Sequence, residues 1–144
     1  MIDNFRGKYR FLSNYYEAPI EYDGIVYLNN EAAFQAQKTT RISEKIKFQN
    51  LNPAEAKKLG RKILLRDDWE KVKEKYMYEI VKAKFTQHQY LKKKLLDTHP
   101  HELIEGTTGW HDNIWGNCEC PKCKDIVGEN KLGKILMRVR EEIG

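Results

Sequence analysis

The chain has 144 residues, of which 40% are hydrophobic and 33% charged. This length suits one domain, and this composition is typical of a globular protein and excludes a disordered chain. No apolar run approaches the roughly 18 residues of a membrane span, and the start of the chain has no apolar signal core, so we expect a cytoplasmic protein without membrane contact. The net charge of +5 favours anionic partners such as phosphates, although lysine runs also occur on solvated helix faces.

A β-hairpin is predicted near the N-terminus. Two apolar runs, residues 19–22 and 25–28, flank the dipeptide Asp23-Gly24. This dipeptide supplies the positive φ angles of a two-residue turn, so the runs should pair as antiparallel strands. The aromatic-rich segment 9–12 is a further candidate strand.

The rest of the chain has mainly helical periodicity. Asn29 or Asn30 can cap the first helix, and Asn52 followed by Pro53 and Glu55 marks the start of the second. Apolar residues recurring at spacings of three and four predict helices over residues 31–40, 53–63, 69–85, 87–96 and 132–143. The sequence thus predicts an α+β fold, a mainly helical single domain of residues 1–144 with a small N-terminal antiparallel β-hairpin.

Residues 99–127, between the last two helices, are predicted to be mostly irregular. A structureless stretch of this length in a compact domain is usually functional or held by a metal. We therefore expect the chemistry of the protein here or near the hairpin.

Glu31, Gln35 and Lys38 are spaced four and three residues apart, so they share one face of the first predicted helix. A carboxylate, an amide and an amine on one face could protonate a leaving group, hold a hydroxyl and bind a phosphate. A solvated stripe with ordinary helical charge pairing has the same spacing. Burial separates the two interpretations, because an apolar pocket favours a protonated Glu31 while the helix dipole favours its ionised form.

Two loops combine polar and aromatic side chains. Ser13 and Asn14 precede two tyrosines and could hold a ribose or a base, or could bond only to their own backbone in a turn. Trp115 could stack on a base while Asp112 orients a water molecule. The alternative is a core tryptophan beside a turn-forming aspartate.

Three cysteines, Cys118, Cys120 and Cys123, lie within six residues. They cannot all pair with one another, which favours thiols or metal ligands over disulfides. A structural zinc site takes four protein ligands, so one is missing from the triplet. Three histidines could supply it: His99, His101 and His111. Free cysteines or a redox-sensitive cluster are the alternatives to zinc.

Seven short motifs in order cover nearly the whole chain. They are residues 5–7 leading into 11–14, residues 22–24, residues 31–38, residues 84–85, residues 103–106, Asp112 with residues 115–116, and residues 128–133 running into 135–140. With these motifs the chain resembles the NADAR (YbiA-like) family, whose known members are N-glycosidases. The cysteine loop and the short length depart from the larger members of that family.

The resemblance implies a hydrolase acting on N-glycosyl bonds to ribose, with no required cofactor. Its substrates would be phosphoribosylamino-pyrimidine intermediates of riboflavin synthesis, or ADP-ribose attached to guanine in nucleic acid. By position in the motifs, Glu31, Lys38 and Asp112 are the predicted catalytic residues. The predicted substrate-binding residues are Arg6, Ser13, Asn14, Gln35, Trp69, Trp115 and Asn130.

Two mechanisms fit this assignment. Glu31 or Asp112 would stabilise an oxocarbenium-like ribosyl cation and guide a water molecule, or the Lys38 amine would attack the opened sugar as a Schiff-base nucleophile. Two other classes of protein also fit the residues: a non-catalytic module that binds ADP-ribose or nucleotides, and a metal-knuckle interaction protein. Both substrates and any oligomeric state are compatible with the sequence.

Overall fold

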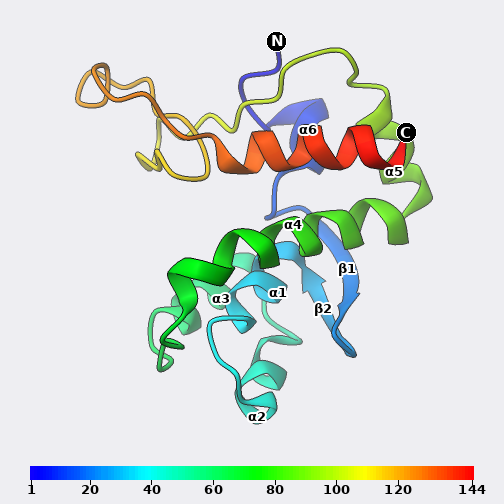
Figure 1. Cartoon of the computed structure of the whole chain (residues 1–144), viewed down its shortest axis with the longest axis vertical. Coiled ribbons are helices and arrows are strands. Elements are labelled where there is room, and N and C mark those ends of the chain that lie inside the picture. Colours follow the sequence, from blue (N-terminus) through cyan, green and yellow to red (C-terminus); the bar gives the residue numbers. More distant parts are fainter. The chain divides into compact units, whose positions relative to one another are not determined.

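The computed structural model describes residues 1–144, and the chain forms two compact units (Figure 1). One is the central unit, Asn14–Gln89, and the other is the terminal unit, Met1–Ser13 with Tyr90–Gly144. The predicted α+β class is confirmed, because helices dominate and the one sheet has two strands. No helix combines the length and the apolar character that crossing a membrane requires. That residues 1–144 form one domain stays a prediction.

The predicted hairpin opens the central unit. Strands β1 (Glu17–Tyr22) and β2 (Ile25–Asn29) pair antiparallel. Asp23 and Gly24 connect them with φ angles of 52° and 82°, the two positive values that a hairpin turn of this length needs. Along β1 the apolar side chains alternate inward, and one face of the hairpin is therefore available to pack on helices.

Helix α1 (Asn30–Ala36) follows β2 directly, and all seven of its residues are buried. The side chain of Asn29 caps it by accepting a hydrogen bond from Ala32 N, so the first of the two predicted caps is the one used. The helix ends four residues before the predicted end at residue 40. The Gln37 side chain bonds back to the Ala33 carbonyl, and the Thr39 hydroxyl accepts from Arg41 N, so side chains replace the helical bonds of the next turn.

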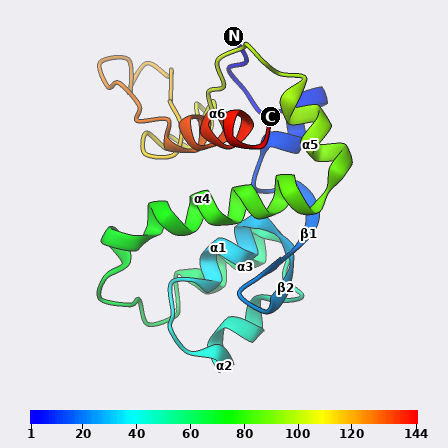
Figure 2. The same ribbon diagram turned by 45° about the vertical axis from the view of Figure 1, so that its right-hand side comes forward.

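Two short helices that the sequence did not predict follow, α2 (Ile42–Lys45) and η2 (Ile46–Phe48). Helix α3 (Pro53–Gly60) starts as predicted with a reciprocal capping box between Asn52 and Glu55. Helix α4 (Trp69–Gln87) is the longest in the chain and packs against β1 and α1 (Figures 1 and 2).

The most deeply buried charged side chain of the central unit is Lys84, which is 1% exposed. It lies on α4, with its Nζ atom 5.3 Å from the ring centre of Tyr16 and 5.1 Å from that of Phe85. Moving an ammonium group out of water disfavours its charged form. Burial therefore lowers the pKa of Lys84 to about 7.

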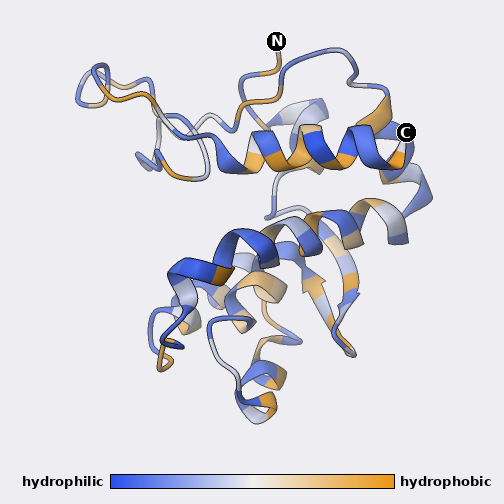
Figure 3. Ribbon diagram, viewed as in Figure 1, coloured by the Kyte–Doolittle hydropathy of each residue, from blue (hydrophilic) through white to orange (hydrophobic).

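The terminal unit contains helices α5 (Gln89–Leu96) and α6 (Lys131–Ile143). The predicted apolar stripe along α6 is visible in Figure 3. Arg140 on this helix donates to the Thr98 hydroxyl and to the His101 carbonyl, which ties α6 to the segment after α5. At the N-terminus, Ile2 forms an isolated parallel bridge with Leu103.

The strand predicted over residues 9–12 is wrong. The segment Gly7–Leu12 forms the 3₁₀ helix η1 instead. Aromatic content favoured a strand, but Phe11 and Leu12 are adjacent and both buried, which alternating strand faces do not permit on a half-buried sheet. The predicted irregular stretch is confirmed, because no helix or strand other than isolated bridges lies between Leu96 and Lys131.

Replacing Lys84 by Met should stabilise the protein at neutral pH, because methionine has a similar volume and no charge to desolvate. In the wild type the folded state binds fewer protons than the unfolded state between pH 7 and 10.5, so its free energy of unfolding should rise with pH across that window. Urea unfolding at several pH values measures both effects. A wild type with no such rise, or a less stable variant at pH 7, would contradict the assignment.

Candidate functional site

The central unit presents a buried carboxylate at the start of α1. Glu31 lies in the first turn of the helix and is only 8% exposed, and Gln35 one turn later is 5% exposed. A solvated stripe would leave these side chains in water, so their burial contradicts that alternative. Removing a carboxylate from water is costly unless hydrogen bonds or charges compensate for the lost hydration. Buried carboxylates with such compensation are common at functional sites.

Gln35 provides one compensating hydrogen bond, with its Nε2 donating to Glu31 Oε1 at 3.0 Å. The other amide atom, Oε1, is buried and has no hydrogen-bond partner in the protein. It packs against Gly60, where an added Cβ would lie 2.0 Å from it. The close approach of α3 at Gly60 therefore holds the Gln35 amide so that its donor, Nε2, faces Glu31. Gly60 is a positioning residue that the sequence did not single out.

Asn14 supports the same helix turn from the other side. Its backbone carbonyl accepts from Glu31 N at 3.2 Å, and its side-chain Oδ1 accepts from Asn30 Nδ2 at 3.2 Å. The first N–H groups of a helix lack partners within the helix, so these bonds fix where α1 begins. The structure thus gives Asn14 a positioning role, and its predicted contact with substrate stays a prediction.

Lys38 follows the end of α1 in a turn and is half-buried. Its N–H bonds to the Gln35 carbonyl at 3.1 Å, which keeps the chain coiled past the helix end. Burial lowers the pKa of the Lys38 amine, the Glu31 carboxylate opposes this by raising it, and Arg61 and Lys57 lower it further. Glu31 and Lys38 therefore interact electrostatically, although Lys38 lies beyond the helix whose face it was predicted to share, and two further cations lie near it that the sequence did not reveal.

Trp69 lies at the start of α4 and is 7% exposed. Its ring contacts that of Phe34 on α1, with centroids 5.1 Å apart and planes inclined by 49°. This contact explains the burial of Trp69 as part of the packing between α1 and α4. A role in binding substrate is untested.

In the terminal unit, Asp112 and Trp115 belong to one turn. Asp112 Oδ1 accepts from Ile114 N at 2.8 Å and from Trp115 N at 2.9 Å. This is the turn-forming arrangement that the sequence offered as the alternative to catalysis. It holds Trp115, which is only partly buried, at a fixed place in the loop. The catalytic role of Asp112 stays a prediction.

Two further candidates of the terminal unit, Arg6 and Ser13, lie in its N-terminal segment. Arg6 is exposed, and its guanidinium lies 4.0 Å from where a Cβ on Gly109 would be, so it sits beside the loop that leads to Asp112. Ser13 ends η1 with its N–H bonded to the Arg10 carbonyl. Both stay predicted substrate-binding residues.

Asn130 is 9% exposed and has a left-handed backbone, with φ at 49°. Its Nδ2 donates to the Leu103 carbonyl at 2.9 Å and its Oδ1 accepts from Glu105 N at 3.0 Å. Both polar ends of this side chain thus bind a neighbouring segment and fix the start of α6. These bonds explain the residue structurally, and substrate contact by Asn130 stays untested.

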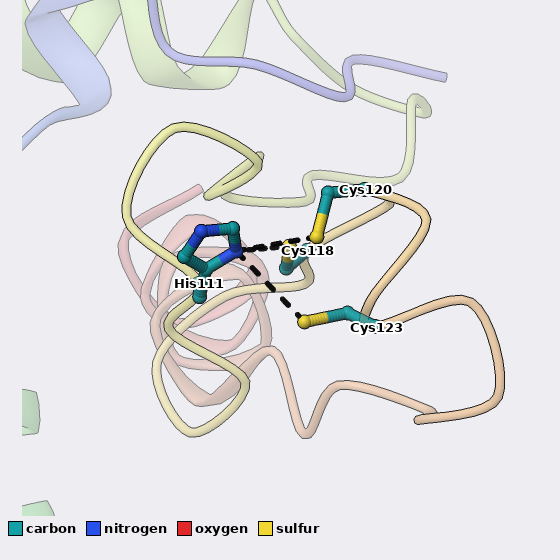
Figure 4. Close-up of side chains that lie close together, drawn as sticks. All are labelled: His111, Cys118, Cys120 and Cys123. Atoms are coloured by element: carbon teal, nitrogen blue, oxygen red, sulfur yellow. Dashed lines mark hydrogen bonds between the residues drawn. The ribbon is translucent and has the colours of Figure 1, made fainter.

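The three cysteines are buried and converge on His111 (Figure 4). Its Nδ1 atom lies 3.3 Å from Cys118 Sγ, 3.2 Å from Cys120 Sγ and 4.0 Å from Cys123 Sγ. His111 is thus the histidine that completes the cluster, whereas His99 and His101 are not part of it. Four ligand atoms within 4.8 Å of one another could hold a metal ion.

The thiols of this cluster differ in acidity. Hydrogen bonds from Cys118 and Cys123, together with the backbone N–H groups of Cys123 and Lys122, lower the pKa of Cys120. Burial raises the pKa of Cys118. The loop therefore favours a thiolate at Cys120 over one at Cys118.

Comparison with known proteins places this architecture in a family. Residues 3–144 match the NADAR domain, so the chain belongs to the NADAR domain family. It is 37% identical to the N-glycosidase YbiA of Escherichia coli over 139 residues, which cover 94% of this chain and 82% of that protein. It is also 36% identical to a riboflavin biosynthesis protein of Vibrio vulnificus over 137 residues, 92% of this chain and 35% of that longer protein.

The fold is shared as well. The NMR structure of the E. coli protein YbiA matches 99% of this chain and 86% of its own, with a TM-score of 0.82 and 34% sequence identity. The family resemblance expected from the seven motifs is confirmed.

We expect Gly60→Ala to displace the Gln35 amide, because the new Cβ would overlap Gln35 Oε1. The variant should lose about 1–3 kcal/mol of stability, the usual cost of overpacking, and part of its activity. In a Gln35→Ala background the same change should cost much less, since the clash with the amide is gone and only the Cβ of residue 35 remains near, at 3.3 Å. Chemical unfolding of the four proteins measures the coupling. Equal losses in both backgrounds would show that Gly60 does not hold Gln35.

Proposed function

We propose that the chain hydrolyses the N-glycosidic bond between a ribose phosphate, or an ADP-ribose, and a nitrogen base. The observation that carries the proposal is the buried Glu31, hydrogen-bonded to Gln35 and coupled to Lys38. The class of reaction is supported by the relatives of similar length, which are named N-glycosidases. The chain is accordingly a hydrolase of glycosyl bonds, and the identity of its substrate is the proposed part.

Glycosyl transfer passes through a ribosyl cation in which positive charge develops at the anomeric carbon. A carboxylate in a low-dielectric setting stabilises such a charge more strongly than one in water. Glu31 is held by Gln35 and by the Asn14 carbonyl, so it needs little reorganisation when that charge forms. We assign Glu31 to stabilising the cation and guiding water, and the base leaves once it is protonated.

The charges around Lys38 suit a phosphorylated ribose. Arg61 and Lys57 are near enough to depress the pKa of Lys38, so three cations share this part of the central unit. A phosphate would relieve their mutual repulsion and bind through charge-assisted hydrogen bonds. Arg6, Ser13 and Trp115 remain proposed substrate-binding residues of the terminal unit.

Two substrates stay in the proposal. Relatives named as riboflavin biosynthesis proteins favour phosphoribosylamino-pyrimidines, and ADP-ribosylated guanine offers the same kind of bond with a second phosphate. Incubating the pure protein with each and measuring the released base distinguishes them. The proposed chemistry uses side chains alone and needs no cofactor. We propose a cytoplasmic location, which is supported by three cysteines without a disulfide.

Replacing Glu31 by Gln should lower the rate of base release by at least about 100-fold, the usual contribution of one positioned catalytic carboxyl group. The side chain keeps its size and can still bond to Gln35, so circular dichroism and the melting temperature should change little. Glu21→Gln, at an exposed glutamate of the hairpin, is the matched control and should keep full activity. A fully active Glu31→Gln protein would remove the residue from the mechanism.

The same variant separates catalysis from mere binding. If the chain were a non-catalytic module for ADP-ribose or nucleotides, the wild-type protein would release no base. The Glu31→Gln variant would then bind ADP-ribose as well as the wild type does. An N-glycosidase releases base and loses that ability in the variant while it retains substrate affinity.

The Schiff-base mechanism predicts a covalent adduct at Lys38. With ribose 5-phosphate and cyanoborohydride, peptide mass spectrometry should locate a reduced adduct on Lys38, because its lowered pKa leaves more neutral amine than an ordinary lysine has. Adduct formation should rise with pH, with a midpoint below 10.5 that falls further in Glu31→Gln, where the carboxylate no longer raises the amine pKa.

Lys62→Gln, at an exposed lysine, is the control and should leave the Lys38 adduct unchanged. Lys84 also has a lowered pKa but is 1% exposed, so sugar should not reach it. Turnover without any adduct on Lys38 would leave direct hydrolysis as the mechanism.

A further inference from the structure

The irregular segment between α5 and α6 has little apolar material with which to order itself. Its buried cluster consists of the three cysteines, while four large apolar side chains of the same loop are exposed: Trp110, Ile114, Ile126 and Val127. Three thiols bury too little apolar surface to fix a loop of this length. Backbone hydrogen bonds such as that from Thr107 N to the Asn117 carbonyl order part of this segment, and a ligand bound by the cluster would add to them.

The spacing of the ligand atoms fits a tetrahedral metal. Bond lengths of about 2.3 Å to sulfur and about 2.0 Å to nitrogen put a tetrahedral nitrogen and sulfur about 3.5 Å apart. The three distances from His111 Nδ1 to the sulfurs, 3.3, 3.2 and 4.0 Å, lie around that value. Figure 4 shows the ring and the three sulfurs pointing towards one centre.

The backbone at His111 has an unfavourable conformation that directs its ring towards the sulfurs. Its φ of 59° is left-handed, which is uncommon for a residue with a side chain. A hydrogen bond from His111 N to the Thr107 carbonyl closes the turn at 2.7 Å. Strain of this kind concentrates at ligand sites, where the gain from binding offsets it.

The cysteines are held by the backbone in a way that suits thiolate ligands. Cys123 N bonds to the Cys120 carbonyl at 2.9 Å, which makes a tight turn over Pro121 and Lys122. Cys118 N donates to Asn113 Oδ1 at 2.9 Å, which fixes the first cysteine against the start of the loop. His111 and Cys118 are thus held by residues outside the cluster, Thr107 and Asn113, while the turn joins Cys120 to Cys123.

We propose that Cys118, Cys120, Cys123 and His111 bind one zinc ion in a closed structural site. Three thiolates and an imidazole in tetrahedral array are a zinc ligand set, and four protein ligands leave no position for a substrate. The ion would fix residue 111 and thereby the turn of Asp112 and Trp115 that follows it. This inference concerns the order of the loop and does not depend on the proposed N-glycosidase activity.

The test starts from the full chain purified under reducing conditions without chelator. Elemental analysis should find one zinc per chain, and Co²⁺ exchanged into the protein should show sulfur-to-cobalt charge transfer and the visible bands of a tetrahedral ion. His111→Ala and Cys123→Ser should bind zinc at least about 10-fold more weakly, because the loss of a ligand costs no less than the loss of its support. His101→Ala, at an exposed histidine outside the cluster, should bind it as the wild type does.

Hydrogen exchange provides a readout of loop order that is separate from affinity. Chelation should remove amide protection from residues 106–130 and leave the central unit protected. Zinc far below one equivalent in the wild type, with no uptake of Zn²⁺ or Co²⁺, would overturn the proposal. Unchanged protection of residues 106–130 after complete zinc removal would overturn the structural role.

Discussion

The central unit depends on keeping one carboxylate out of water. Glu31 stands in the first turn of a helix that is buried along its whole length, and it stays there because Gln35 and the Asn14 carbonyl satisfy this turn. Glycine at position 60 follows from the same constraint, since any Cβ would displace Gln35. A purely structural helix would avoid these costs with apolar residues, so the retention of a buried carboxylate and an unpartnered amide oxygen indicates function.

The elements that the sequence predicted are those specified by neighbouring residues. The Asp23-Gly24 turn needs only two positive φ angles, and the box between Asn52 and Glu55 is closed by residues three apart. Glu31 and Gln35 share a face of α1 as predicted, whereas Lys38 lies in the turn after the helix, which ends at Ala36. The cations around Lys38 could not be predicted, because Lys57 and Arg61 approach it only when α3 packs against α1.

The metal ligands of the cysteine loop could likewise be predicted only in part from the sequence. Three clustered cysteines signalled metal ligation, but three histidines were available as the fourth ligand. Only the left-handed turn at His111 brings one of them to the sulfurs, and a left-handed histidine is not specified by local sequence. The strand wrongly expected over residues 9–12 has a related cause, because its aromatic content reflects burial of adjacent side chains in a 3₁₀ turn.

Several residues that carry the family motifs hold the backbone in place. Asn130 binds the segment at Leu103 and Glu105 with both ends of its amide, and Trp69 packs on Phe34. A motif residue whose polar atoms are already used by the protein has less to offer a substrate. Lys38 differs from these, because it is only half-buried and its amine forms no hydrogen bond within the protein, while burial lowers its pKa and Glu31 raises it. The proposed chemistry of the central unit therefore depends on Lys38 and the buried Glu31, whereas Trp69 serves the packing of that unit and Asn130 the backbone of the terminal unit.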